Sequence, residues 1–174
     1  MRTYGILLIL GLVLAFIAFQ ARTGIFRRAN PGPPANKYTR EMMEEQRLSE
    51  EDLAALKDRY AGAAVTSSGL RFIVRAPGAG EPPSVGAEVT VNYEGRLLAG
   101  ERKFDSSYDR HEPFRFRVGT GAVIKGWDEA VATMRPGEKR TLIVPWWLAY
   151  GPSGRGPIPP RATLVFDVEL VSAR

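Results

Sequence analysis

The feature that most constrains this chain is its last 27 residues, Leu148 to Arg174, where a rigid loop runs directly into an alternating strand. The loop is rich in glycine and proline, and it runs from Tyr150 to Ile158-Pro159-Pro160. One face of the strand would carry four apolar residues: Leu164, Phe166, Val168 and Leu170. The other face would carry Val165, Asp167 and Glu169. A period of two indicates an antiparallel strand with one buried face. The loop, which carries an aromatic hydroxyl, is therefore expected to form one wall of a small apolar pocket.

The same alternation recurs upstream and predicts further short strands. Residues 71–76, 89–94, 114–118 and 141–144 each have a strand-like pattern. One stretch differs, because four apolar residues recur there at helical spacing: Ile124, Trp127, Val131 and Met134. About five strands and one helix predict an α+β domain, with an antiparallel sheet folded over a single helix.

The composition disfavours chemistry that needs a metal, a thiol or a histidine base. The 174 residues include no cysteine and one histidine, so disulfides, thiolate metal sites and thiol nucleophiles are excluded. His111 lies between two charged residues and is expected in an exposed loop. Zinc enzymes and Ser-His-Asp hydrolases are disfavoured for the same reason, and we expect no metal and no cofactor.

The basic net charge of +5 belongs to the start of the chain rather than to the predicted domain. Residues 1–37 contain five basic residues and no acid, whereas residues 38–174 contain 19 of each sign. A neutral domain lacks the basic surface that nucleic-acid binding requires, so we expect no nucleic-acid partner.

A run of 19 uncharged residues, Thr3 to Ala21, predicts a transmembrane anchor or a signal segment within residues 1–22. At about 1.5 Å per residue, its length matches the hydrocarbon core of a bilayer. Phe19 and Gln20 make Ala21 a poor cleavage site, which favours an uncleaved anchor. The side of the membrane on which the domain lies stays open. The arginines after the run favour a cytoplasmic domain by the positive-inside rule, whereas the short basic start resembles an export signal.

Residues 23–65 are expected to form a linker and a helical stalk before a domain at residues 66–174. The segment NPGPPAN, residues 30–36, is typical of a spacer. Ser49 and Asp52 fit a capping box at the start of a helix. Its narrow apolar stripe would consist of Leu53, Leu56 and Tyr60. We favour a solvated stalk, and the open alternative is a helix that packs on the domain or self-associates.

Aromatic residues near loops and strand ends are the remaining candidates for function: Tyr93, Phe104, Phe114, Trp127, Tyr150 and Phe166. Taken alone, they fit either a plain core or the lining of a pocket. Together with six motifs in order, they resemble the FKBP family, the macrolide-binding peptidyl-prolyl isomerases. The motifs are VNYEG (91–95), KFDSSYDR (103–110), PFRFRVG (113–119), VIKGWDEAV (123–131), LAYG (148–151) and IPPRATLVFDVEL (158–170).

This resemblance implies a bent, five- to six-stranded antiparallel sheet around one short helix, with a pocket between them. Trp127 would form the pocket floor under a proline ring. The backbone N–H of Ile124 and the hydroxyl of Tyr150 would bind substrate carbonyls, and Asp105 would border the twisting amide, paired with Arg110. The other walls would come from Tyr93, Phe104, Phe114, Val123, Ile158 and Phe166.

Two departures from the family pattern stand out. The loop between Gly151 and Ile158 is about one residue shorter than in small single-domain relatives, and it carries Arg155. Trp146 and Trp147 stand where many bacterial relatives have small or charged residues. We hypothesise that at least one of these indoles is exposed beside the pocket and contacts clients or the membrane.

The resemblance thus implies an isomerase of X–Pro bonds in folding proteins, anchored to a bacterial membrane through residues 3–21. We expect the domain on the extracytoplasmic (periplasmic) side, with the cytoplasmic face as the alternative. Its partners would be proline-containing polypeptides and, as inhibitors, macrolides. The alternative function is a non-catalytic docking or assembly subunit of a membrane complex.

Overall fold

The computed structural model describes residues 47–174, which contain two α-helices, seven strands and two short 3-10 helices. In chain order these are α3 (Glu50–Arg59), β1 (Ala64–Val65), β2 (Arg71–Ala76), β3 (Glu88–Leu97), β4 (Lys103–Ser106), β5 (Phe114–Arg117), α4 (Lys125–Val131), β6 (Lys139–Val144), η1 (Trp146–Leu148), η2 (Gly151–Ser153) and β7 (Leu164–Ala173). Neither α-helix in this part of the chain is long and apolar enough to cross a membrane. The anchor and spacer predicted upstream lie outside the described residues.

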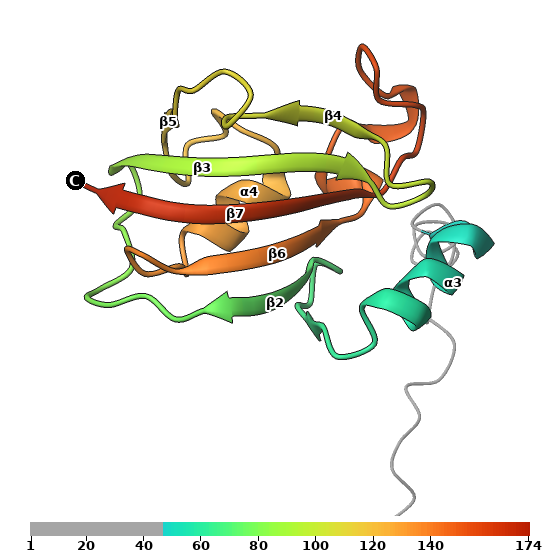
Figure 1. Cartoon of the computed structure of the whole chain (residues 1–174), viewed down its shortest axis with the longest axis horizontal. Helices are drawn as coiled ribbons and strands as arrows, with labels where there is room; N and C mark the ends of the chain where they lie inside the picture. The colour runs from blue at the N-terminus through green and yellow to red at the C-terminus, as the bar shows by residue number, and fades with distance from the viewer. Residues whose placement is uncertain (1–46) are drawn as a thin grey trace, which may run out of the picture. The chain divides into compact units, whose positions relative to one another are not determined.

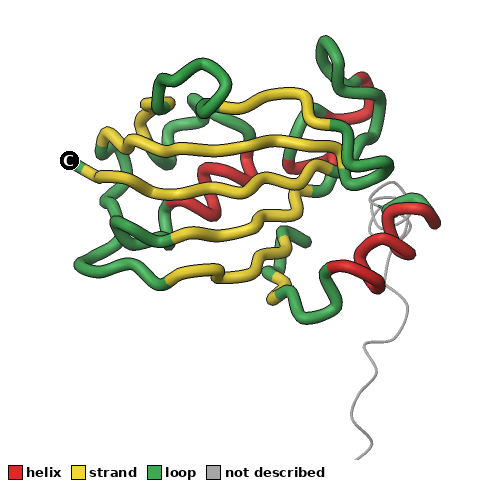
Figure 2. The backbone as a smooth tube through the Cα atoms, in the orientation of Figure 1, coloured by secondary structure: helices red, strands yellow, loops and turns green. Residues whose placement is uncertain are grey.

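The strands form one antiparallel sheet in the order β1-β2-β6-β7-β3-β4, with β5 also paired to β3. α4 lies against one face of this sheet (Figures 1 and 2). The predicted α+β architecture is confirmed, but the sheet has seven strands rather than five to six. The count differs because β1 has only two residues, and β4, with the sequence KFDS, has a single apolar residue and therefore no alternation.

The core lies between the sheet and α4, where the predicted alternation places the apolar residues. Along β3, Val89, Val91 and Tyr93 are buried, while the residues between them are partly exposed. β7 buries the predicted set from Leu164 to Leu170 on the same side. Trp127, Val131 and Met134 close the core from the helix side. Burial of these faces supplies the main driving force for the fold.

A second, smaller core lies at one end of the other face of the sheet and corrects the solvated-stalk interpretation of α3. Leu56 and Tyr60 of the helix are buried against three residues of the sheet side: Leu98, Ile143 and Val165. Ser49 caps the helix as predicted, accepting a hydrogen bond of 3.0 Å from the backbone of Asp52. Leu53 does not belong to the buried stripe, because it is 52% exposed. α3 is therefore packed on the domain, which is the alternative that the sequence left open.

Candidate functional site

A cavity of about 640 Å³ opens beside α4, and its walls come from many separate elements of the fold. Strands β3, β4, β5 and β7 contribute Tyr93, Phe104, Asp105, Phe114 and Phe166. The segment entering α4 and the helix itself contribute Gly121, Ala122, Val123, Ile124, Lys125 and Trp127. Ala149, Tyr150 and Arg155 complete the lining from residues 149–163, which we call the pocket loop.

Trp127 forms the buried centre of the aromatic wall. Its ring meets Tyr93 and Phe166 edge to face, with centroids 4.9 Å and 5.2 Å away. These T-shaped contacts are favourable for aromatic rings and hold each ring in one orientation. The indole N–H of Trp127 has no hydrogen-bond partner among the described residues. Unsatisfied buried groups of this kind are rare and tend to occur at functional sites.

Gly95 of β3 allows two of the aromatic walls to meet. A Cβ atom at this position would lie 2.8 Å from both the Phe104 and Phe166 rings. Real Cβ atoms do not come that close to ring carbons, so any larger residue would push the rings apart. Packing therefore explains the glycine of the VNYEG motif. Without a side chain there, the rings of Phe104 and Phe166 pack edge to face with their centroids 5.7 Å apart.

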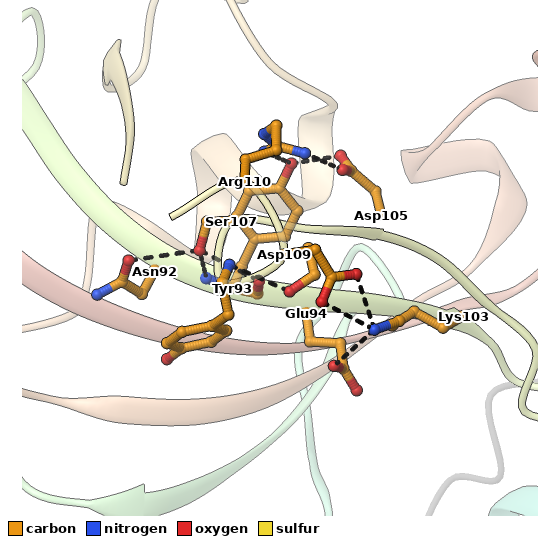
Figure 3. Close-up of polar contacts among 10 residues, drawn as sticks. Asn92, Tyr93, Glu94, Lys103, Asp105, Ser107, Asp109 and Arg110 are labelled. Atoms are coloured by element: carbon orange, nitrogen blue, oxygen red, sulfur yellow. Dashed lines mark hydrogen bonds and ion pairs between the residues drawn. The ribbon is translucent and has the colours of Figure 1, made fainter. Parts of the chain in front are cut away.

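Three side chains form a closed polar triangle at the edge of the cavity. Tyr93 donates its hydroxyl hydrogen to Asp105, and Arg110 forms an ion pair with the other carboxylate oxygen (Figure 3). Arg110 also donates to the Tyr93 hydroxyl oxygen at 2.9 Å. The ion pair predicted between Asp105 and Arg110 is therefore present, and Tyr93 joins it.

These contacts shift the proton equilibria of the triangle in opposite directions. Burial, together with the hydrogen bond to Asp105, raises the pKa of Tyr93 to about 12, although Arg110 opposes the change. Burial alone would raise the pKa of Asp105, but hydrogen bonds from Tyr93 and Arg110 and the charge of Arg110 outweigh it and lower that pKa. Asp105 is therefore a carboxylate and Tyr93 a neutral phenol across the physiological range.

The two proposed donors to substrate carbonyls are both available. Among the described residues, the hydroxyl of Tyr150 has no hydrogen-bond partner, and the same holds for the backbone N–H of Ile124. Both residues line the cavity. Ile124 is the N-cap of α4, where backbone N–H groups lack helical partners.

A model of the FKBP-type peptidyl-prolyl cis-trans isomerase family matches residues 79–171. The chain belongs to this family. It is 52% identical over 86 residues to FK506-binding protein 2 of Aspergillus fumigatus, a match that covers 49% of this chain and 64% of the relative. It is 50% identical over 105 residues to the peptidyl-prolyl cis-trans isomerase Fkbp12 of Drosophila melanogaster, covering 59% of this chain and 96% of that one.

Solved structures of FKBP proteins share the fold. The structure of FkpA from Escherichia coli matches with a TM-score of 0.64 and 33% identity, over 94% of this chain and 71% of that one. AtFKBP13 matches with a TM-score of 0.62 and 39% identity, over 64% of this chain and 98% of that one.

Nine of the eleven residues predicted from the FKBP resemblance line the cavity: Tyr93, Phe104, Asp105, Phe114, Val123, Ile124, Trp127, Tyr150 and Phe166. Arg110 lies outside the lining and acts on it through Asp105. Ile158, predicted as a further wall, is not part of the lining; it is 7% exposed and packs in the main core. Its backbone pairs with Arg155 in an isolated bridge, which turns the Arg155 side of the loop toward the cavity instead.

The paired tryptophans of this FKBP domain do not form the exposed surface that we hypothesised. Trp146 is 8% exposed, Trp147 is half-buried, and neither lines the cavity. The Trp147 indole donates to the Ser68 carbonyl at 2.9 Å, and its ring lies against Gly69. The Trp147 indole therefore attaches the segment before β2 to the body of the domain, and the Trp146 indole donates to the Arg47 carbonyl before α3 at 3.4 Å.

Proposed function

We propose that this protein is a peptidyl-prolyl cis-trans isomerase that binds the proline of an X–Pro bond in the aromatic cavity. The observation that carries the proposal is the convergence of five aromatic side chains from five elements on one cavity: Tyr93, Phe104, Phe114, Trp127 and Phe166. Membership of the FKBP-type isomerase family and the names of the relatives support it.

The lining suits a reaction that makes and breaks no covalent bond. Rotation about an X–Pro bond faces a barrier of about 18–20 kcal/mol, because amide resonance is lost on the way. The planar amide is polar and well hydrated, and the twisted transition state is less polar. A cavity that replaces water with aromatic surface destabilises the planar form relative to the twisted one. Each 1.36 kcal/mol of such preference gives about a tenfold rate gain.

The polar groups would orient the peptide around this apolar centre. The Tyr150 hydroxyl and the Ile124 N–H would donate to substrate carbonyls on either side of the twisting bond. The Asp105 carboxylate would lie near the amide, where Arg110 and Tyr93 keep it ionised and fixed in position. No proton transfer is required of any of these residues.

An isomerisation assay on the full-length protein separates the enzyme from a non-catalytic docking subunit. Exchange NMR on a tetrapeptide such as Ala-Leu-Pro-Phe measures cis–trans rates directly, without a coupling protease. Acceleration at catalytic protein concentrations supports the enzyme. Binding of the peptide without any acceleration contradicts the enzyme and supports the docking role.

We further propose that residues 3–21 anchor the protein in a bacterial membrane, with the domain on the extracytoplasmic, periplasmic side. The uncharged run of 19 residues and its poor cleavage site support this proposal. Proline-containing polypeptides in that compartment would be the substrates, and FK506-like macrolides would compete for the cavity. Protease added to intact cells tests the topology: cleavage only after the inner membrane is broken would place the domain on the cytoplasmic side and contradict it.

A further inference from the structure

The wall of the cavity carries an unbalanced positive charge. Three charged residues line it, namely Asp105, Lys125 and Arg155. Asp105 is already neutralised by Arg110. Within residues 47–174, the side chains of Lys125 and Arg155 form no ion pair, so no acidic side chain there offsets their charge.

Arg155 is held where its charge faces the cavity. Its backbone is locked in the bridge with Ile158, with N···O distances of 3.0 Å and 2.9 Å. Its guanidinium lies over the ring of Tyr150, 5.8 Å from the ring centroid, and Tyr150 is the residue whose hydroxyl is proposed to bind a substrate carbonyl. A third cation supports this side of the loop, since Arg102 donates to the Pro157 carbonyl at 2.5 Å.

We propose that this site prefers X–Pro substrates with an acidic residue directly next to the proline, and that Arg155, helped by Lys125, determines the preference. The inference rests on the proposed isomerase function and names the substrate class of the same cavity. A carboxylate beside the bound proline would meet two cations without acidic partners, at a surface where water only partly screens them. The preference should therefore weaken as salt rises.

The test uses the full-length protein and exchange NMR on two matched peptide pairs. One pair places Glu or Gln before the proline (Ala-Glu-Pro-Phe, Ala-Gln-Pro-Phe), and the other places Glu or Gln after it. We expect kcat/KM for Glu to exceed that for Gln by about fivefold in at least one pair at 50 mM salt, and by about twofold or less at 500 mM. A ratio near one in both pairs overturns the proposal.

Variants assign the preference to residues. Arg155→Gln should lower the Glu/Gln ratio, and the double variant with Lys125→Gln should bring it to about one. Arg174→Gln is the matched control, because it removes the same charge from an exposed residue that does not line the cavity and lies at the opposite end of strand β7 from the pocket loop. It should keep the full ratio. A ratio that persists in the double variant contradicts the assignment.

The same assay distinguishes a wrong charge preference from a wrong isomerase function. If the Gln peptides are turned over but Glu gives no advantage, the charge preference is wrong and the isomerase stands. If no peptide is accelerated, the isomerase function is wrong, and the substrate preference is overturned with it.

Discussion

The carboxylate of Asp52 in α3 accepts a hydrogen bond of 2.8 Å from the hydroxyl of Thr163, the last residue of the pocket loop. Both side chains are buried. The carbonyl of Thr163 in turn accepts from the backbone of Leu98 at 2.9 Å. Thr163 thus connects the end of the pocket loop to two other segments, helix α3 and the end of β3.

Asp52→Ala should destabilise the protein by about 1–3 kcal/mol, because it leaves the buried Thr163 hydroxyl without a partner. Urea denaturation followed by fluorescence measures the change. Asp58→Ala, at an exposed position of the same helix, is the control and should stay within about 0.5 kcal/mol of the parent. Equal effects of the two substitutions would mean that the bond to Thr163 contributes nothing.

Packing of α3 on the sheet predicts opposite results for two leucines three residues apart. Leu56→Ala should cost about 2–4 kcal/mol, since its side chain is 7% exposed and fills the second core. Leu53→Ala should cost less than about 0.5 kcal/mol, because Leu53 is 52% exposed. A solvated stalk would instead make both substitutions neutral.

Arg140 should be the most sensitive charged position outside the cavity. Its guanidinium is buried, pairs with Glu138 at 2.5 Å, and donates to the hydroxyl and carbonyl of Thr133 just after α4. Arg140→Met should cost about 3–5 kcal/mol, because it strands the buried Glu138 carboxylate. The control Lys139→Met breaks only an exposed pair with Glu169 and should cost less than about 1 kcal/mol. Thermal unfolding distinguishes them, and a tolerated Arg140→Met would contradict the account.

The main sheet and α4 could be predicted from the sequence, because apolar residues recur there with a period of two or at helical spacing. Most of the cavity could be predicted from the six motifs that resemble the FKBP family. The packing of α3 on the domain was the alternative that the sequence left open, and the solvated stalk that we favoured was wrong. The signal was weak: Val165 is a single apolar residue on a strand face that also carries Asp167 and Glu169, and its partner Ile143 looks like any strand residue. Which face of the pocket loop turns inward, with Arg155 lining and Ile158 buried, depends on a tertiary bridge that no local pattern encodes.

Turnover of a neutral peptide should be independent of pH over a wide range. The lowered pKa of Asp105 adds stability that is present above its ordinary value of 3.8 and is lost as pH falls through the lower folded value. The raised pKa of Tyr93 adds stability that is present below 10.0 and is lost as pH rises through about 12. Activity should therefore stay flat between these two ordinary values. A titration of kcat/KM with a midpoint near pH 6.5 would point to an ionising group that the site does not contain.

Asp105→Asn tests the polar triangle itself. Loss of the carboxylate should lower the pKa of Tyr93 below about 12, and burial should still hold it above 10.0. NMR of ¹³C-labelled tyrosine follows the titration, and Asp109→Asn, outside the triangle, should leave it unchanged. An unchanged Tyr93 pKa in Asp105→Asn would show that the two side chains do not interact in solution.

The most direct test of the central claim is the isomerisation rate of Phe114→Ala. Phe114 lines the cavity and is 37% exposed, so its removal opens the aromatic wall without emptying the core. We predict that kcat/KM on a neutral tetrapeptide falls at least tenfold while the far-ultraviolet circular dichroism spectrum is unchanged. The control Tyr108→Ala removes an aromatic ring that is 50% exposed and lies outside the cavity, and it should keep parental activity. Parental turnover in a folded Phe114→Ala protein would contradict the assignment of catalysis to this cavity.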